Sequence, residues 1–368
     1  MGASKKLRLS KVTLENFRIF EHEESFDLAP ITLLIGPNNS GKSSVLKAIR
    51  LFKQAAANNS LYGISNFNKI GLGSNFEDVQ NEYSNNKFIN LSFSFANYSF
   101  DFREISPMGA RQTIKEGEEL IIARSVITKK ESIQIVDLED KEIIFDLGVH
   151  YLAPVRGNVA RELHTFEIQD PFTRILETFT KAHLSPENID YLKKWFLDFG
   201  IADSIDIHAV GKYASAIELT KHGKTFNLAQ MGSGTAQLLP MLMQTAIGKG
   251  DLILLEEPDN NLHPNYQALL ADVFADAYHQ FNTHFIVETH SEYLLRKLQV
   301  LVKRGTLNPS DVAIYYFKDG NNIDAAQRAT KLTIDENGEL NGKMNKGFMD
   351  EADSLTWELL RTNKPSKH

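Results

Sequence analysis

The chain of 368 residues is longer than one small core organises, so we expect about two structural units or one domain with a large insertion. Its 40 basic and 47 acidic residues give a net charge of -7, which excludes a global positive field for nucleic acid or anionic lipid. The absence of cysteine excludes disulfides, thiolate zinc sites and cysteine nucleophiles. No secretory signal and no membrane-spanning apolar run is present, so we expect a cytoplasmic protein without membrane contact.

The N-terminal part reads mainly as β structure. Residues 7–20 alternate apolar and polar positions and predict one strand with a single buried face. Residues 31–36 form a continuous apolar run, which indicates a strand covered on both faces. Short β-rich segments separated by charged or glycine-containing turns follow between about 88 and 146, and they predict an antiparallel β lobe.

From about residue 160 the pattern changes to a helical period, with a helix that starts at Ser185 and stops at Gly200. Two strands are expected over 204–211 and 214–220. After Gly232, three helices alternate with strands over 252–257, 284–289 and 312–318, which predicts a parallel sheet. We therefore divide the chain into an N-terminal lobe (1–159), a helical and β insertion (160–225) and a C-terminal lobe (226–368).

The segment after the first buried strand has the spacing of a phosphate-binding loop, with glycine, four residues, then glycine, lysine and serine. Such a turn directs backbone N–H groups and a helix N-terminus at phosphate oxygens. We expect Lys42 to contact the β and γ phosphates of ATP and Ser43 to bind Mg²⁺. The alternative is a glycine-rich turn without function. The candidate nucleotide-binding residues are Gly36, Asn38, Asn39, Ser40, Gly41, Lys42, Ser43 and Ser44.

A second buried strand, LILLEE, ends in two carboxylates. Burial of an unpaired carboxylate costs roughly several kcal/mol unless a cation lies nearby. We expect Glu256 to hold Mg²⁺ through its water shell, and Glu257 to orient and deprotonate the water that attacks the γ-phosphate. The alternative is a strand end that leaves both acids in solvent.

The next strand ends in VETHS, at the edge of a parallel sheet where ligands bind. His290 is a candidate for a hydrogen bond to the γ-phosphate, whereas Ser291 reads as a helix cap. His263, which precedes Pro264, is either another cap or a functional residue. A further small-residue turn, QMGSGTAQ, contains Ser233, Gly234 and Gln237 before an apolar helix. This turn and the helix N-terminus after it are typical of a second phosphate-binding segment, or cradle. Two cradles in one chain suggest an ATP site that is completed by a second copy of the chain.

The order of these motifs resembles that of the ABC-type ATPases, in the branch with the RecF-like, SMC-like and overcoming-lysogenization-defect ATPases. The family's opening is matched by LENFRIF, its Walker A motif by GPNNSGKSS and its Walker B motif by LILLEEP. Its D-loop is matched by NLHP, its switch histidine by THS and its signature by MGSGTAQ. The C-terminal stretch also resembles compact AAA-type ATPases of bacterial anti-phage defence systems. The resemblance implies an α/β P-loop NTPase of ABC type, with a mixed sheet core, an antiparallel β lobe and a short helical insertion.

The chain departs from this family pattern at several points. Walker B has Glu256 where aspartate is common, and the signature lacks the usual leucine-serine start. Residues 151–156 stand where a glutamine loop is expected, and Arg156 there either senses phosphate, contacts a partner or is a plain surface residue. No long coiled coil is predicted, which argues against chromosome tethering. Only 78 residues follow His290, without an obvious metal triad, so we expect no nuclease activity from this chain.

The resemblance favours a slow ATPase switch that dimerises, or forms a higher homo-oligomer, around ATP and Mg²⁺ and controls a separate nuclease or toxin. The alternative is a DNA-binding repair ATPase similar to the RecF-like group, with Lys5, Lys6, Arg8 and Lys11 as its basic surface. A small-molecule kinase is a third reading, in which the signature and His290 have no role. Free phosphate as product would favour a switch over a kinase.

Overall fold

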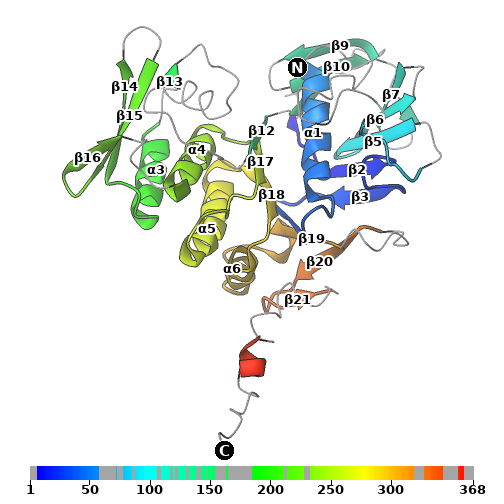
Figure 1. Cartoon of the computed structure of the whole chain (residues 1–368). Coiled ribbons are helices and arrows are strands. Elements are labelled where there is room, and N and C mark those ends of the chain that lie inside the picture. Colours follow the sequence, from blue (N-terminus) through cyan, green and yellow to red (C-terminus); the bar gives the residue numbers. More distant parts are fainter. Residues whose placement is uncertain are drawn as a thin grey trace, which may run out of the picture.

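The computed structural model places a seven-stranded mixed sheet at the centre of the molecule (Figure 1). Its first five strands are parallel, and the last two are antiparallel additions at one edge. In sheet order the strands are β12 (Val149–Leu152), β17 (Leu252–Glu256), β18 (His284–Thr289), β4 (Ile31–Ile35), β19 (Val312–Phe317), β20 (Ala329–Ile334) and β21 (Leu340–Asn341). The structure describes residues 6–57, 72, 78–84, 88–105, 109–116, 119–120, 123–129, 132–137, 142–146, 148–153, 163–164, 185–210, 214–227, 233–318, 327–342 and 355–359.

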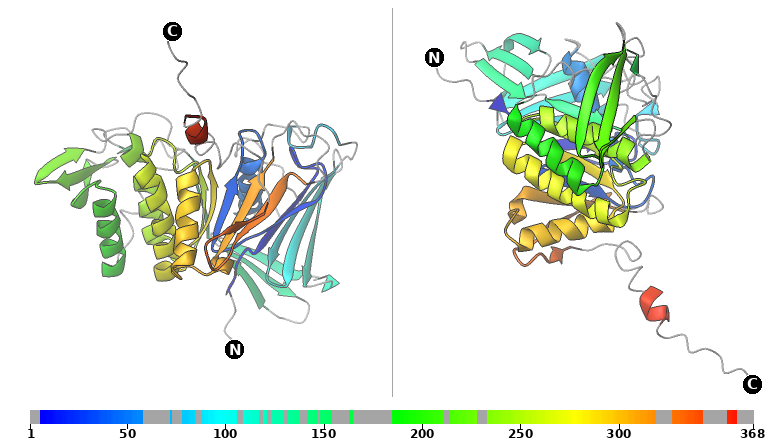
Figure 2. Two further views of the ribbon diagram at one scale, coloured as in Figure 1. Left: turned by 90° about the horizontal axis from the view of Figure 1, so that it is seen from below. Right: turned by 90° about the vertical axis from the view of Figure 1, so that its left-hand side faces the viewer.

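The central sheet is covered on both faces, as its continuous apolar strands predict. All five residues of β4 and all six of β19 are buried. Because side chains alternate along a strand, Leu33 joins one hydrophobic core and Leu34 joins the other. Figure 2 shows the resulting layers, with helices on one side of the sheet and α1 with antiparallel strands on the other.

Four helices cover the first face, and their buried residues belong to a single core. They are α3 (Pro186–Asp198), α4 (Ser233–Ile247), α5 (Pro264–Phe281) and α6 (Glu292–Lys303). Ser185 and Ser291 cap α3 and α6 by accepting backbone N–H groups, as the sequence predicts. His263 does the same for α5 through Nδ1, which accepts from the backbone N–H of Asn265 at 3.3 Å, so its capping role is confirmed.

The second face is packed against α1 (Lys42–Ala57) and an antiparallel sheet of six strands. This sheet contains the strands over 88–120 of the β lobe predicted over about 88–146, whereas the strands over 123–146 belong to a separate sheet. Burial alternates along the third strand of the six-stranded sheet, so that one face of that sheet points into the core and the other to solvent. In sheet order the strands are β3 (Glu24–Asp27), β2 (Lys11–Glu15), β5 (Phe88–Phe95), β6 (Tyr98–Ile105), β7 (Gly109–Glu116) and β8 (Glu119–Leu120).

Phe52 of α1 fixes the helix to this lobe, and we expect its loss to cost about 3–5 kcal/mol of stability. Its ring lies 4.4 to 5.9 Å, centroid to centroid, from those of Phe93, Phe95, Phe100 and Phe102. Alanine leaves a cavity among these rings, whereas leucine fills part of it. Urea unfolding of Phe52→Ala and Phe52→Leu tests this: equal stability of Phe52→Ala and the unmodified protein would show that the lobe does not depend on this contact.

Two smaller sheets complete the described structure. One pairs β1 (Lys6–Leu7) with β11 (Glu142–Asp146), followed by β10 (Ser132–Asp137) and β9 (Ala123–Lys129). The other belongs to the predicted insertion, where β15 (Ala214–Lys221) pairs with β13 (Leu163–His164), β14 (Ser204–Val210) and β16 (Lys224–Asn227). A 3₁₀ turn, η4 (Pro309–Asp311), precedes β19. No helix among the described residues is long and apolar enough to cross a bilayer.

The single strand predicted over residues 7–20 is wrong. The structure has a two-residue strand, β1, and a separate strand, β2, that ends at Glu15. Asn16 and Arg18 have φ values of 51° and 54°, a left-handed conformation that no strand continues through. Alternation of apolar residues persists through this turn, which is why it reads as strand in the sequence.

His284 at the start of β18 predicts a pH dependence of stability. Burial and, to a smaller extent, the charge of Arg8 lower its pKa to about 4 against the opposing effect of Asp311. The unfolded chain therefore binds a proton between about pH 6.5 and pH 4 that the native protein does not, so stability falls as the pH drops through this window. We expect His284→Gln to lose less stability than the unmodified protein between about pH 7.5 and pH 5 in urea unfolding. If both proteins lost the same stability over this pH range, His284 would not be the source of the pH dependence.

Candidate functional site

The phosphate-binding sequence folds as a turn between β4 and α1, the strand, turn and helix expected of it. Gly36 and Gly41 have φ values of 139° and 105°, which L side chains rarely adopt. A Cβ at Gly36 would lie 2.5 Å from the carbonyl oxygen of Phe317, and one at Gly41 would lie 2.2 Å from Cδ1 of Ile19. Both glycines are therefore required by backbone conformation, and Gly36 also by the space that the backbone of Phe317 leaves.

The polar residues of this turn divide into exposed and buried groups. Asn38 and Asn39 are exposed at its tip. Ser40 is buried, and its hydroxyl has no hydrogen-bond partner in the described structure. Ser44 is also buried, and its backbone N–H donates to the carbonyl of Gly41 at 2.9 Å. A buried hydroxyl without a partner is costly in a finished core, so Ser40 points to a polar group that binds here.

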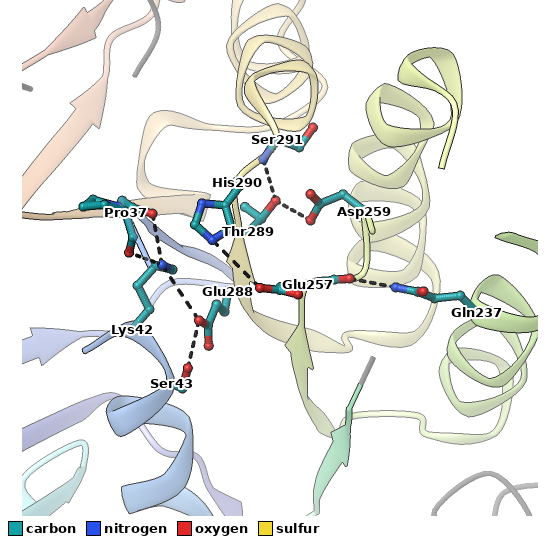
Figure 3. Close-up of polar contacts among 11 residues, drawn as sticks. Pro37, Lys42, Ser43, Gln237, Glu257, Asp259, Glu288, Thr289, His290 and Ser291 are labelled. Carbon is teal, nitrogen blue, oxygen red and sulfur yellow. Dashed lines mark hydrogen bonds and ion pairs between the residues drawn. The ribbon is translucent and has the colours of Figure 1, made fainter. Parts of the chain in front are cut away.

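Lys42 opens α1 and points back into the turn (Figure 3). Its ammonium donates to the carbonyls of Gly36 at 3.0 Å and Pro37 at 2.6 Å, and it lies 3.9 Å from Oε1 of Glu288. Burial lowers its pKa, while the carboxylates of Glu288 and Glu257 act in the opposite direction. A buried ammonium held by the loop carbonyls is a point charge ready for a phosphate.

The two carboxylates of the second predicted motif have different surroundings. Glu256 ends β17 and accepts a hydrogen bond from the hydroxyl of Tyr151 on β12. The guanidinium of Arg50 lies 3.7 Å from the centre of the Tyr151 ring. Glu257 follows with a φ of 48°, and its backbone N–H donates to the carbonyl of Glu288 at 2.8 Å. This left-handed conformation ends β17 at Glu256, because a strand does not continue through a positive φ.

Glu288 is the site residue that sequence reasoning missed. Ser43 donates its hydroxyl to Oε1 of Glu288 at 2.9 Å, so the structure pairs Ser43 with Glu288 and pairs Glu256 with Tyr151. Burial raises the pKa of Glu288 to about 7, against the bond from Ser43 and the charge of Lys42. The signal in the sequence was a carboxylate directly after the apolar run FIV, in a strand predicted to be buried.

His290 lies beside Glu257, as expected from strand ends that meet at one edge of the sheet. Its Nε2 is 3.9 Å from Oε1 of Glu257. Burial lowers the pKa of His290, and Lys42 lowers it further against the opposing effect of Glu257. A neutral imidazole at this position can donate or accept one hydrogen bond to a phosphate oxygen or a water.

Asp259 is a second residue that the sequence did not single out. Oδ1 of Asp259 accepts from the hydroxyl of Thr289 at 2.5 Å, and that hydroxyl accepts from the backbone N–H of Ser291 at 2.9 Å. Burial raises the pKa of Asp259, against the bond from Thr289. This chain of bonds fixes the loop after β17 to the end of β18, on either side of His290 (Figure 3).

The predicted signature lies at the start of α4. Ser233 and Gly234 open the helix, and residues 228–232 before it lie outside the described part of the chain. Gln237 is buried, and its Nε2 donates to the carbonyl of Glu257 at 2.7 Å. The signature helix is thus attached to the carboxylate turn of its own chain.

The donor atoms at this edge of the sheet fit Mg²⁺. The ion prefers hard oxygen ligands and takes one or two carboxylates together with phosphate oxygens and water. Ser43 supplies a hydroxyl, and Glu256 and Glu288 supply carboxylates, of which Oε2 of Glu288 is buried without a hydrogen-bond partner in the described structure. No group of three or more histidine, cysteine, aspartate or glutamate side chains that could hold a metal occurs among the described residues.

The remaining candidate residues for phosphate or DNA contact lie away from this site or outside the described residues. Arg156 and Lys5 are not described. Arg8, a member of the proposed basic surface, donates to the carbonyl of Asn282 at 2.7 Å at the opposite end of the sheet strands. Part of that basic cluster therefore makes a structural contact.

Comparison with known families decides the classification. Residues 31–296 match the model of the family described as "AAA domain, putative AbiEii toxin, Type IV TA system". The chain belongs to this family. Residues 307–359 of this AAA-domain ATPase match a further model, "Protein of unknown function (DUF3696)". No curated protein matches the chain.

Solved structures similar to this chain include SMC head domains. An SMC head bound to the C-winged helix domain of ScpA has a TM-score of 0.57 at 15% identity, over 89% of this chain and 98% of that chain. The head from Thermotoga maritima has a TM-score of 0.49 at 12% identity, over 89% and 100%. A head from Pyrococcus furiosus with an extended coiled coil, bound to the C-terminal domain of ScpA, has a TM-score of 0.49 at 13% identity, over 96% of this chain and 100% of that chain. The first similarity, with the sheet order above, confirms the predicted P-loop NTPase fold with an SMC-head-like arrangement.

Proposed function

We propose that this AAA-domain ATPase is a slow, ATP-hydrolysing switch that closes as a dimer around ATP and controls a separate effector protein. The observation that carries the proposal is the meeting of Lys42, Glu257 and His290 at adjacent strand ends, with Glu257 and His290 3.9 Å apart. A cation for phosphate, a candidate base and an imidazole beside it are the groups that γ-phosphate hydrolysis needs.

Each residue has a defined role in this proposal. The backbone of residues 36–44 and the N-terminus of α1 cradle the phosphates, and Lys42 neutralises the β and γ oxygens. Glu257 orients the attacking water and accepts its proton, and His290 hydrogen-bonds the γ-phosphate or that water. Ser43 would hold Mg²⁺, which when bound would neutralise phosphate charge, and the sequence predicts Glu256 as the accompanying carboxylate.

The dimer follows from where the signature lies. Gln237 is bonded to the carbonyl of Glu257, which leaves the N-terminus of α4, with Ser233 and Gly234, as a second phosphate cradle. We infer that this cradle closes on the P-loop of another copy. A ligand that touches both copies stabilises the closed state by its differential affinity, so ATP sets the lifetime of the dimer.

The effector is proposed to be a nuclease or toxin in a bacterial defence system. The description of the family, with its reference to a toxin and a Type IV TA system, supports this role. The SMC head of similar fold is bound to a domain of ScpA, which supports the idea that a head of this kind acts through a separate protein.

Light scattering after size-exclusion chromatography tests the proposal. We expect the mass to double when ATP and Mg²⁺ are added, and we expect the effect to be absent with ADP. The Lys42→Ala chain should stay at its nucleotide-free mass. A mass that does not respond to ATP, in a protein that binds ATP, would contradict the switch.

A further inference from the structure

Glu288 and Ser43 form a buried pair at the first turn of α1. The hydroxyl of Ser43 lies 2.9 Å from Oε1 of Glu288, and Glu288 is 5% exposed. Its other carboxylate oxygen, Oε2, is buried and has no hydrogen-bond partner in the described structure. Glu288 belongs to β18, which pairs in parallel with β17 on one side and with β4 on the other. The pair therefore lies next to an interior strand of the sheet.

A charged carboxylate in this position is stabilised by a nearby cation. Burial of an uncompensated carboxylate costs several kcal/mol, roughly, even after relaxation. Lys42 is 3.9 Å away, but its ammonium already donates to the carbonyls of Gly36 and Pro37. The charge of Glu288 is thus only partly compensated by the protein.

Glu256, the carboxylate predicted to accompany Ser43, has another partner. Its Oε2 accepts a hydrogen bond from the hydroxyl of Tyr151, and the guanidinium of Arg50 lies over the ring of that tyrosine. The hydrogen bond from Tyr151 holds Glu256 at the side of β12. Among the described carboxylates, Glu288 is the one that Ser43 contacts, and it retains an oxygen for a further ligand.

We propose that Glu288 and Ser43 together hold the Mg²⁺ that accompanies ATP, and that Glu256 lies outside this pair, held by Tyr151. The assignment rests on the proposed function, because it names the protein ligands of the ion at the same site. A hydroxyl and a single carboxylate satisfy an ion that takes its other ligands from phosphate and water.

The test measures how strongly Mg²⁺ promotes ATP binding, without hydrolysis. The full chain is titrated with a fluorescent, non-hydrolysable ATP analogue in excess Mg²⁺ and in EDTA, and the ratio of the two dissociation constants gives the enhancement by the ion. Glu288→Gln keeps the shape and removes the charge. Glu292→Gln, in the first turn of α6 where the carboxylate pairs with Arg296, is the matched control, and Glu256→Gln is compared with both. Binding of Mn²⁺, followed by electron paramagnetic resonance, gives a direct second readout.

We expect Glu288→Gln to reduce the enhancement about tenfold or more, as for other groups that support a bound metal. In EDTA the variant should bind the analogue as well as the unmodified protein or better, since one negative charge near the phosphates is gone. Glu292→Gln should leave both constants unchanged, and Glu256→Gln should reduce the enhancement less than Glu288→Gln.

An unchanged enhancement in Glu288→Gln would overturn the assignment while the proposed switch stands. Equal weakening in Mg²⁺ and in EDTA would overturn it too, because it would show that Glu288 only supports the loop. A larger effect of Glu256→Gln would return the ion to the predicted Ser43 and Glu256 pair. Failure of the unmodified protein to bind the analogue would contradict the proposed function itself, and the inference with it.

Discussion

Replacing Lys42 by alanine is expected to weaken ATP binding about 100-fold or more and to remove hydrolysis with it. The ammonium is buried in the turn and held by two loop carbonyls, so its position is set before the nucleotide arrives. A charge-assisted contact in such a place is worth about 3 kcal/mol, which corresponds to roughly 100-fold. The loss also leaves Glu288 without its nearby cation, which adds repulsion against phosphate.

Lys53→Ala is the matched control, since Lys53 is on the same helix and its ammonium donates to the carbonyl of Val149 away from the turn. Isothermal titration with ATP and a phosphate-release assay measure both variants. If Lys42→Ala binds ATP within about threefold of the unmodified protein, the ammonium does not bind phosphate, and the P-loop assignment is wrong.

Replacing Glu257 by glutamine is expected to reduce hydrolysis about 10²–10⁴-fold, the usual contribution of a general base. ATP binding should be unchanged, because the side chain is proposed to contact the attacking water and not the phosphates. The same variant should accumulate as a dimer in ATP, since the step that opens the dimer is blocked. His290 lies 3.9 Å from this carboxylate and is kept in the variant.

Phosphate release and light scattering on the same sample separate the possible results. Loss of hydrolysis with retained ATP binding and a persistent dimer supports the role of Glu257. Normal hydrolysis by Glu257→Gln would show that the base is elsewhere. Glu292→Gln, two residues beyond His290 and half-buried beside Arg296, should behave as the unmodified protein in both assays.

Local patterns in the sequence were sufficient for much of this fold. The P-loop is encoded in consecutive residues, because its glycines, its lysine and its preceding apolar strand lie within one stretch of chain. The caps at Ser185 and Ser291 are likewise local, and each is confirmed by a hydrogen bond to a backbone N–H three residues ahead. The alternation of strands and helices after residue 232 gave the parallel sheet for the same reason.

The missed features depend on contacts between distant segments. Glu288 meets Ser43 only because β18 is inserted between β17 and β4, and the sequence does not state that order. Tyr151 reaches Glu256 because β12 pairs with β17, 105 positions apart at these two residues. The roles of the named site residues and the division into parts 1–159, 160–225 and 226–368 stay predictions.

The most direct test of the account mixes two inactive chains. Lys42→Ala lacks a working P-loop, and Ser233→Arg blocks the cradle at the start of α4. If each ATP site combines the P-loop of one copy with the signature of the other, random pairing yields mixed dimers with one intact site, and activity returns to about a quarter of the unmodified rate. Phosphate release from the mixture measures this. A mixture as inactive as its two components, although mixed dimers form, would contradict a shared site.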